Sequence, residues 1–390
     1  MPILTLNPRL LDTGSPPIPE IQAWGTRYAR EGGVLLNMCQ AVPSHAPAPG
    51  MLERLARAAG DAGSATYGPI LGEPDLREAY AAELARVYSG HPDASQVAIT
   101  AGCNQAYFVA MMALVQHGDA VLLPTPWYFN HRMTLDMLGA EPRPLPCRAE
   151  RNFVPDPEEA AALIDDRVRA IVLVTPNNPT GAIYPPEVIA RFYDLCRERG
   201  IWLVLDETYR DFLSEAQSRP HDLLSGGGWP ENLIQLYSFS KSFAIPGHRL
   251  GALAAPAALL PELGKVMDCV QICAARAGQI ALSWGLGALD EWREANRVEM
   301  QTRAEAVRAA FSRLQGWELQ SLGAYFAYVR HPFGETSAWK VAERLASEHG
   351  LLCLPGPAFM GREAHVRIAF ANVDAAGIVT MEERLRAAGV

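Results

Sequence analysis

The chain has 390 residues, of which 49% are hydrophobic and 20% charged, and its net charge is −9. This length and apolar content support a large buried core and exclude a disordered or disulfide-stapled protein. The excess of acidic side chains argues against a nucleic-acid partner, because such surfaces need clustered positive charge. Only three of the 34 basic residues are lysines, namely Lys241, Lys265 and Lys340.

The cysteines and the absence of several known motifs indicate the cellular compartment and exclude some classes of enzyme. Seven scattered cysteines, without a C-x-x-C pair, indicate reduced thiols and predict a cytoplasmic location. The sequence shows neither a signal peptide nor an apolar run long enough to span a membrane, so we expect no membrane partner. It also lacks metal-ligand histidine spacings and the motifs G-x-S-x-G, G-x-x-x-x-G-K-[ST] and G-x-G-x-x-G. These absences argue against zinc enzymes, serine hydrolases, P-loop proteins and Rossmann enzymes.

The predicted elements begin with a proline-rich, irregular arm over about the first 45 residues. Two helices follow at 53–59 and 75–88, the second with Pro74 in its first turn. From about residue 95 to residue 255, short apolar runs alternate with helical patterns. The apolar residues of these runs are successive, which predicts strands buried on both faces of a mostly parallel sheet. The runs lie at 97–100, 120–123, 170–174, 201–206 and 233–238.

The helix expected at 187–199 lies between two of these strands. C-terminal to the sheet, a charged helix is predicted at 292–314 and another helix at 338–348, with strand-like segments GAYFAYVR and HVRIAFA around the latter. This pattern predicts a smaller α+β domain beside an α/β domain built as three αβα layers. The expected boundaries are 46–285 for the large domain, and 1–45 with 286–390 for the small domain and the arm.

Of the three lysines, Lys241 has the most informative position. Lys265 and Lys340 lie in helical contexts that are typical of solvated lysines. Lys241 follows the strand at 233–238 in the sequence S-F-S-K, at the sheet edge where open α/β sheets place their sites. A lysine in a serine-rich loop is more often a surface residue, so its neighbours decide its role.

Polar residues follow the neighbouring strands at the same edge. Asn178 lies in the turn V-T-P-N-N-P-T-G, Asp206 ends its strand, and Tyr209 follows three residues later. Two of these positions have an ordinary alternative, because Asn178 suits a turn and Asp206 or Glu207 suits a cap. Gly102 lies between a strand and a helix, where exposed backbone N–H groups suit a phosphate.

The motifs N-N-P-T-G, D-x-x-Y and S-x-S-K, followed by an arginine eight residues after the lysine, form an ordered set. From about residue 34 to residue 370 the chain resembles the fold type I, class I/II aminotransferases, which use pyridoxal 5′-phosphate. The resemblance implies a homodimer with shared active sites that moves the amino group of an L-amino acid to a 2-oxo acid. It also implies that Lys241 holds the coenzyme as a Schiff base and then moves the substrate proton.

The resemblance implies the other coenzyme contacts as well. Asp206 corresponds to the carboxylate that pairs with the pyridine nitrogen, and Asn178 and Tyr209 correspond to the partners of the ring 3-oxygen. Tyr128, more than Trp127, corresponds to the aromatic residue that stacks on the ring. The implied phosphate ligands are Gly102, Cys103, Asn104, Ser238, Ser240 and Arg249, with Tyr67 reaching the phosphate of the neighbouring subunit.

Fewer substrate contacts are implied. Arg367, in HVRIAFA, corresponds to the arginine that binds the α-carboxylate through paired hydrogen bonds, which lysine does not reproduce. Asn178 and Ala41 are the other expected substrate neighbours, and Ala41 stands where relatives carry glycine, which predicts a shifted backbone or a tighter pocket. Arg276 binds a second substrate carboxylate or is a surface arginine. Four aromatic residues line a side-chain pocket or belong to the core: Trp24, Trp127, Tyr325 and Phe326.

One alternative to transamination stays open, and two others lack the motifs or the domain that they require. The same coenzyme site supports a lyase or an oxidase, through β-elimination, decarboxylation or oxidation of an amino acid. The S-F-S-K sequence also matches the S-x-x-K motif of serine β-lactamases, although the accompanying S-D-N and K-T-G motifs are absent. A coenzyme-binding transcription regulator carries a basic DNA-binding domain ahead of this fold, where we expect only the proline-rich arm.

Overall fold

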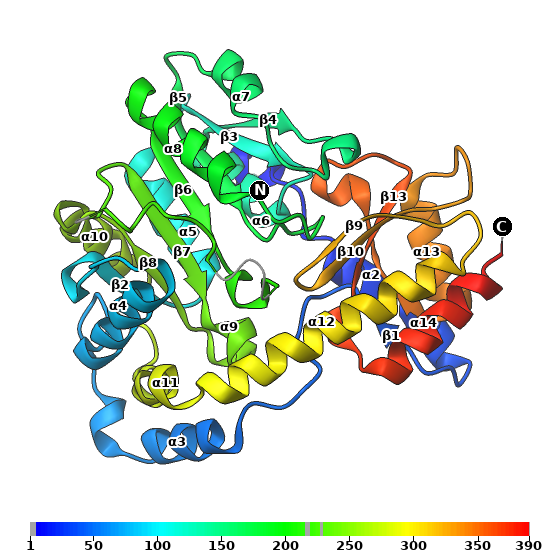
Figure 1. Cartoon of the computed structure of the whole chain (residues 1–390), viewed down its shortest axis with the longest axis horizontal. Coiled ribbons are helices and arrows are strands. Elements are labelled where there is room, and N and C mark those ends of the chain that lie inside the picture. Colours follow the sequence, from blue (N-terminus) through cyan, green and yellow to red (C-terminus); the bar gives the residue numbers. More distant parts are fainter. Residues whose placement is uncertain (1–4, 215–218, 227–228, 390) are drawn as a thin grey trace.

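The computed structural model describes residues 5–214, 219–226 and 229–389. Its main sheet has seven strands: β2 (Val97–Thr100), β3 (Ala120–Thr125), β4 (Glu141–Pro146), β5 (Val168–Val174), β6 (Trp202–Asp206), β7 (Leu233–Ser238) and β8 (Gly251–Ala254). Their order is β2-β8-β7-β6-β5-β3-β4 (Figure 1). Only β8 runs antiparallel to its neighbours. The predicted mostly parallel sheet is therefore confirmed.

Two strands of this sheet have no counterpart among the predicted elements. β4 contains Pro142, Pro144 and Pro146, and proline is confined to edge strands because it donates no ladder hydrogen bond. β4 indeed lies at the sheet edge. β8 reads Gly-Ala-Leu-Ala, without the β-branched residues typical of strands. Its Gly251 leaves room for the chain at Gly102, because a Cβ at position 251 would lie 2.6 Å from the carbonyl carbon of Gly102.

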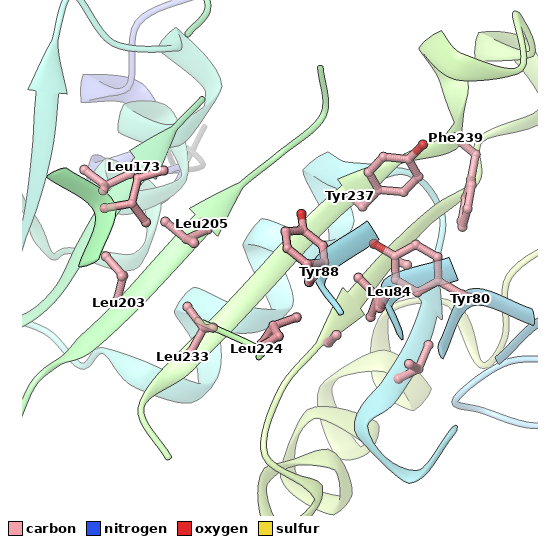
Figure 2. Packing of buried hydrophobic residues seen from close by; sticks show 14 of the residues in the cluster. Tyr80, Leu84, Tyr88, Leu173, Leu203, Leu205, Leu224, Leu233, Tyr237 and Phe239 are labelled. Carbon is pink, nitrogen blue, oxygen red and sulfur yellow. The ribbon is translucent and has the colours of Figure 1, made fainter. Parts of the chain in front are cut away.

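Helices cover both faces of the sheet, because alternate residues of each strand point to opposite sides. Leu203 and Leu205 pack on one side and Val204 on the other. Figure 2 shows the first side, where Tyr80 and Tyr88 lie beside the strands. The first side is covered by α3 (Pro49–Ala59), α4 (Pro74–Tyr88), α7 (Pro157–Leu163), α8 (Pro186–Arg199) and α11 (Arg276–Ala288), and the second by α5 (Cys103–Leu114), α6 (Phe129–Leu138) and α10 (Leu260–Gln271). The predicted three-layer architecture is confirmed.

A second sheet follows in the C-terminal part of the chain. It contains β9 (Glu318–Gly323), β10 (Phe326–Arg330), β12 (Leu354–Pro355) and β13 (His365–Ala369), all antiparallel, in the order β12-β13-β10-β9. Its hydrophobic cluster includes residues of α12 (Asp290–Ser312), α13 (Ala338–His349) and α14 (Ala375–Ala387). The long helix α12, yellow in Figure 1, runs from the first sheet's helices to this second sheet.

The prediction of an irregular arm over the first 45 residues is wrong for the described part, and residues 1–4 lie outside the described residues. The segment forms α1 (Pro8–Asp12), α2 (Ile18–Arg30) and β1 (Leu36–Asn37), which pairs with β11 (Leu351–Leu352). The prolines of the α2 sequence occupy its N-cap and first turn, where proline favours a helix start because no N–H donor is needed. Trp24 of α2 meets Trp339 of α13 edge to face, with ring centroids 6.1 Å apart.

No helix within the described ranges has both the length and the apolar character needed to cross a membrane.

A buried charge cluster fixes the segment that follows β6. The Arg293 guanidinium donates to Glu83 Oε1 at 2.7 Å and to Asp211 Oδ1 at 2.6 Å. Burial alone would raise the pKa values of Glu83 and Asp211, but the charges of Arg293 and Arg210, together with hydrogen bonds that include those of Arg293, outweigh burial and hold both pKa values below their usual range. The cluster thus joins α4 and α12 to residue 211, close in sequence to Asp206 and Tyr209.

We expect Arg293→Met to lower the free energy of unfolding by about 3–5 kcal/mol at pH 7, because two buried carboxylates lose the cation that they share. Arg86, 2.7 Å from Glu83 Oε2, stays as a partner of Glu83. Both carboxyl pKa values are depressed in the folded protein from ordinary values of 4.5 and 3.8. Their stabilising contribution is therefore present above these ordinary values and is lost as the pH falls through the folded values. The difference between the variant and the parent protein should accordingly shrink near pH 4.

Urea denaturation at both pH values measures this effect. The control is Arg308→Met on the same helix, where the arginine side chain is 60% exposed and lies 3.8 Å from Glu305. This control should change stability by about 0.5 kcal/mol or less. Similar small losses in the two variants would contradict the structural role of Arg293.

Candidate active site

The carboxyl ends of β2, β3, β5, β6 and β7 lie at one edge of the main sheet, because β8 reverses direction between β2 and β7. A cavity of about 450 Å³ opens at this edge. It brings together twelve of the residues predicted from the sequence: Ala41, Cys103, Asn104, Tyr128, Asn178, Asp206, Tyr209, Ser238, Ser240, Lys241, Arg249 and Arg367. Gly102 precedes two of them, whereas Tyr67 is 79% exposed and lies outside the cavity.

Lys241 lies on α9 (Phe239–Ser242), directly after β7. Ser238 caps this short helix, since its Oγ accepts a hydrogen bond from the Ser240 N–H at 3.3 Å. The Lys241 amine donates to the backbone carbonyl of Ala41. Burial, with the positive charges of Arg249 and Arg367, lowers the pKa of Lys241 to about 8. This shift brings the free amine, which a nucleophile or a general base requires, closer to neutral pH, although the protonated form still predominates at pH 7.

Asp206 is the last residue of β6 and is buried. Its Oδ1 accepts hydrogen bonds from the Thr208 N–H at 3.1 Å and hydroxyl at 2.7 Å, and His131 Nε2 lies 3.3 Å from Oδ2. Burial alone would raise the pKa of Asp206, but the contacts with His131 and Thr208 outweigh it and lower this pKa. Asp206 therefore remains a charged carboxylate in the lining of the cavity. His131 stacks on Tyr107, with ring centroids 3.9 Å apart.

The turn between β2 and α5 presents hydrogen-bond donors that suit an anion. Gly102 has φ +85° and caps α5, and a Cβ at this position would lie 2.3 Å from Arg249 Nη2. Glycine is therefore required both by the backbone angle and by the close approach of the guanidinium. The first N–H groups of α5 have no partner within the helix and favour an anion. Together with Arg249 and the hydroxyls of Ser238 and Ser240, they form a donor set that fits a phosphate group.

Arg367 brings the second sheet to the cavity. It lies on β13, 2% exposed, with its guanidinium carbon 4.9 Å from the Phe326 ring and 5.1 Å from the Phe359 ring. It donates to Asn178 Oδ1 at 2.9 Å and to the carbonyl of Cys39. Its buried Nε has no hydrogen-bond partner among the described residues. Burial lowers the pKa of Arg367 only to about 10, so a charged fork faces the cavity.

This arrangement matches a known family. Residues 34–385 match the model of the family described as aminotransferase class I and II. The chain belongs to the class I and II aminotransferases. It is 31% identical over 329 residues to an aspartate aminotransferase of Pyrococcus horikoshii, covering 83% of each chain. It is 32% identical over 330 residues to the arginine–pyruvate transaminase AruH of Pseudomonas aeruginosa, covering 84% of this chain and 81% of that one.

Solved structures agree with this assignment. The aspartate aminotransferase from Thermus thermophilus with maleate superposes with a TM-score of 0.89 at 26% identity, covering 98% of this chain and 99% of that one. The predicted family, fold type, amino-transfer activity and dependence on pyridoxal phosphate are thus confirmed. The lyase or oxidase alternative is not favoured.

The donors in the cavity of this aminotransferase also fit pyridoxal phosphate. A primary amine, a buried charged carboxylate and a phosphate cradle line one cavity. The described residues include no group of three His, Cys, Asp or Glu side chains that could hold a metal ion.

Aromatic residues of the aminotransferase divide between the cavity and the core. Tyr128 lines the cavity, and its hydroxyl accepts a hydrogen bond from Asn130 Nδ2 at 3.0 Å. The indole of Trp127 is buried in the hydrophobic cluster of α5 instead, which favours Tyr128 as the stacking residue. The other three aromatic residues with open roles also lie in hydrophobic clusters and do not line the cavity: Trp24, Tyr325 and Phe326.

Asn372, which belongs to none of the sequence motifs described above, holds the segment that contains Ala41. Asn372 Nδ2 donates to the carbonyl of Asn37 at 3.0 Å and to that of Gln40, while Asn372 Oδ1 accepts from the Val42 N–H at 2.9 Å. Ala41 has no left-handed backbone angle, so alanine takes this position without strain.

Arg276 of the aminotransferase lies outside the cavity. Its Nε donates to Glu73 at 2.5 Å, and its Nη1 donates to the Gly63 carbonyl at 2.6 Å and to Thr66 Oγ1 at 2.7 Å. Within the chain, Arg276 therefore fixes the segment between α3 and α4. Because its guanidinium already has these partners, Arg276 fits neither expectation well: it is not a free surface arginine, and it is not free to bind a substrate carboxylate.

Proposed function

We propose that Lys241 covalently holds pyridoxal phosphate and moves the substrate proton while the amino group of an L-amino acid passes to a 2-oxo acid. The observation that carries this proposal is a single cavity lysine with a pKa of about 8, between a phosphate cradle and Arg367. When bound, pyridoxal phosphate supplies an electron-withdrawing ring that stabilises negative charge at the substrate Cα. The free amine of Lys241 is the base that takes the proton from this carbon.

The remaining cavity residues bind and orient. Asp206, kept charged by His131 and Thr208, pairs with the protonated ring nitrogen. Arg367 grips the substrate α-carboxylate through two parallel hydrogen bonds, which fixes the orientation of the Cα–H bond. For the coenzyme we propose that Asn178 and Tyr209 bind the ring 3-oxygen, that Tyr128 stacks on the ring, and that the phosphate is held by Gly102, Cys103, Asn104, Ser238, Ser240 and Arg249.

We further propose a homodimer with shared active sites, in which Tyr67 reaches the phosphate of the partner subunit. Its 79% exposure and its position outside its own chain's cavity support this role. The proposed domains are 46–285, and 1–45 with 286–390, supported by the separate clusters of the two sheets. A cytoplasmic location stays a proposal, supported by seven unpaired cysteines.

A half-reaction tests the transfer. Mixed with an amino acid alone, the holoenzyme should lose the visible absorbance of its coenzyme and release one equivalent of 2-oxo acid without ammonia. A 2-oxo acid added afterwards should restore the absorbance. Continuous ammonia release from the amino acid would contradict amino-group transfer and support the lyase or oxidase alternative.

A further inference from the structure

We propose that the amino donor of this enzyme has an uncharged, apolar side chain, which packs against Ile18, Val42 and Phe129. The proposal rests on the function proposed above, in which Arg367 holds the α-carboxylate and Lys241 reacts at Cα. The names of the relatives do not decide the donor, because one names aspartate and another names arginine.

The first observation concerns positive charge. Among the described residues, the cationic side chains that line the cavity are Lys241, Arg249 and Arg367. Each already has a role at the reacting amine, the phosphate or the α-carboxylate. A second carboxylate on the donor would enter the cavity without a counter-charge, and burying an unpaired carboxylate is costly.

A partner subunit does not readily supply the missing cation through Arg276. That guanidinium lies 2.5 Å from Glu73 and also donates to Thr66 and to the carbonyl of Gly63. It would have to leave its own carboxylate partner to bind one on the substrate. The gain in one ion pair would thus be offset by the loss of another.

The second observation is that the cavity offers no free carboxylate to a cationic donor side chain. Asp206 is the only carboxylate that lines the cavity among the described residues, and it is already held by contacts with His131 and Thr208. A lysine or arginine side chain on the donor would therefore also enter without a partner. Charged donors of both signs are disfavoured by the same cavity.

An apolar wall lies next to the α-carboxylate receptor. Ile18 begins α2 and Phe129 begins α6, and both belong to or pack against one hydrophobic cluster. The Phe129 ring lies 5.7 Å from the ring of Phe359, over which the Arg367 guanidinium lies at 5.1 Å. Val42 is another apolar residue that lines the same cavity. A side chain on the Cα of a donor gripped by Arg367 is therefore within reach of apolar surface, and its burial there is favourable.

Single-turnover rates with pairs of similar size test the proposal: leucine against aspartate, and methionine against glutamate and lysine. Leucine and methionine should react at least about 100-fold faster than the charged donors. Aspartate, glutamate or lysine reacting as fast as leucine would overturn the proposal, and so would glutamine reacting faster than methionine. Calorimetry supplies a second readout, in which 4-methylpentanoate should bind the holoenzyme and succinate should not.

A variant of the wall makes the test specific. Ile18→Asn should lower the leucine-to-alanine rate ratio about tenfold, because the alanine methyl group has little surface to lose. The control is Val379→Asn on α14, an aliphatic residue that is 56% exposed outside the cavity, and it should keep this ratio. An unchanged ratio in Ile18→Asn would overturn the role of the wall.

The outcomes also separate this proposal from the proposed function. Ammonia release with leucine and methionine still preferred would contradict amino-group transfer and support the apolar preference. A preference for aspartate without ammonia release would support the transfer and overturn the apolar preference.

Discussion

Replacement of Lys241 by alanine should lower kcat/KM for transamination by about 10⁴-fold or more, because the chain then loses both its nucleophile and its base. The variant should also lose the visible absorbance of the bound coenzyme. The fold should persist, because the Lys241 amine reaches into the cavity, where it donates to the backbone carbonyl of Ala41. Stopped-flow half-reactions measure the first effect, and circular dichroism with thermal unfolding checks the fold.

Lys265→Ala is the matched control. Lys265 lies on α10, with a side chain that is 71% exposed and paired with Glu262 at 2.7 Å. Its replacement should leave both the absorbance and the rate within about twofold of the parent enzyme, because exposed ion pairs contribute little. A coloured, active Lys241→Ala enzyme would refute the assignment of Lys241.

Asp206→Asn should reduce kcat by about 100- to 1000-fold, because it removes a preorganised charge from the reacting centre. The amide keeps the size of the carboxylate but removes the charge that holds the ring nitrogen protonated. The coenzyme should also bind more weakly, and equilibrium dialysis with pyridoxal phosphate measures this affinity directly.

Asp194→Asn provides the control for this substitution. Asp194 lies on α8, and its side chain is 57% exposed and 3.3 Å from Arg197. The control should retain the parent rate and coenzyme affinity. If Asp206→Asn retained them too, the buried carboxylate would not be the partner of the ring nitrogen.

Strand positions in the sequence predicted Lys241, Asn178 and Asp206 at one sheet edge, because the carboxyl ends of these strands meet, whereas most other candidate residues were implied by the family resemblance. Buried parallel strands have a strong signal in successive apolar residues, and polar residues immediately after them must lie at one edge. Successive residues of an extended chain point to opposite sides, and this alternation explains why Asp206, and not Glu207, lines the cavity. Asp206 lines the cavity, while Glu207 points to the opposite side and accepts a hydrogen bond from Gln235 Nε2 at 2.9 Å.

The supporting residues were not predictable in the same way. His131, Asn372 and Phe359 act through contacts between segments far apart in the chain, and no local motif marks them. One signal in the sequence points to His131: it is the last residue of the segment P-T-P-W-Y-F-N-H, which also contains Tyr128. The helix α2 was missed because prolines at a helix start resemble those of an irregular arm.

The most direct test of the central claim uses the scarcity of lysine. Borohydride reduction of the holoenzyme fixes the coenzyme on the amine that holds it, and peptide mapping by mass spectrometry then locates the label. The chain has three lysines, so the result is unambiguous. The account predicts the label on the peptide that contains Lys241, with Lys265 and Lys340 unmodified, whereas a label on either of these two lysines or on the N-terminal amine instead would contradict it.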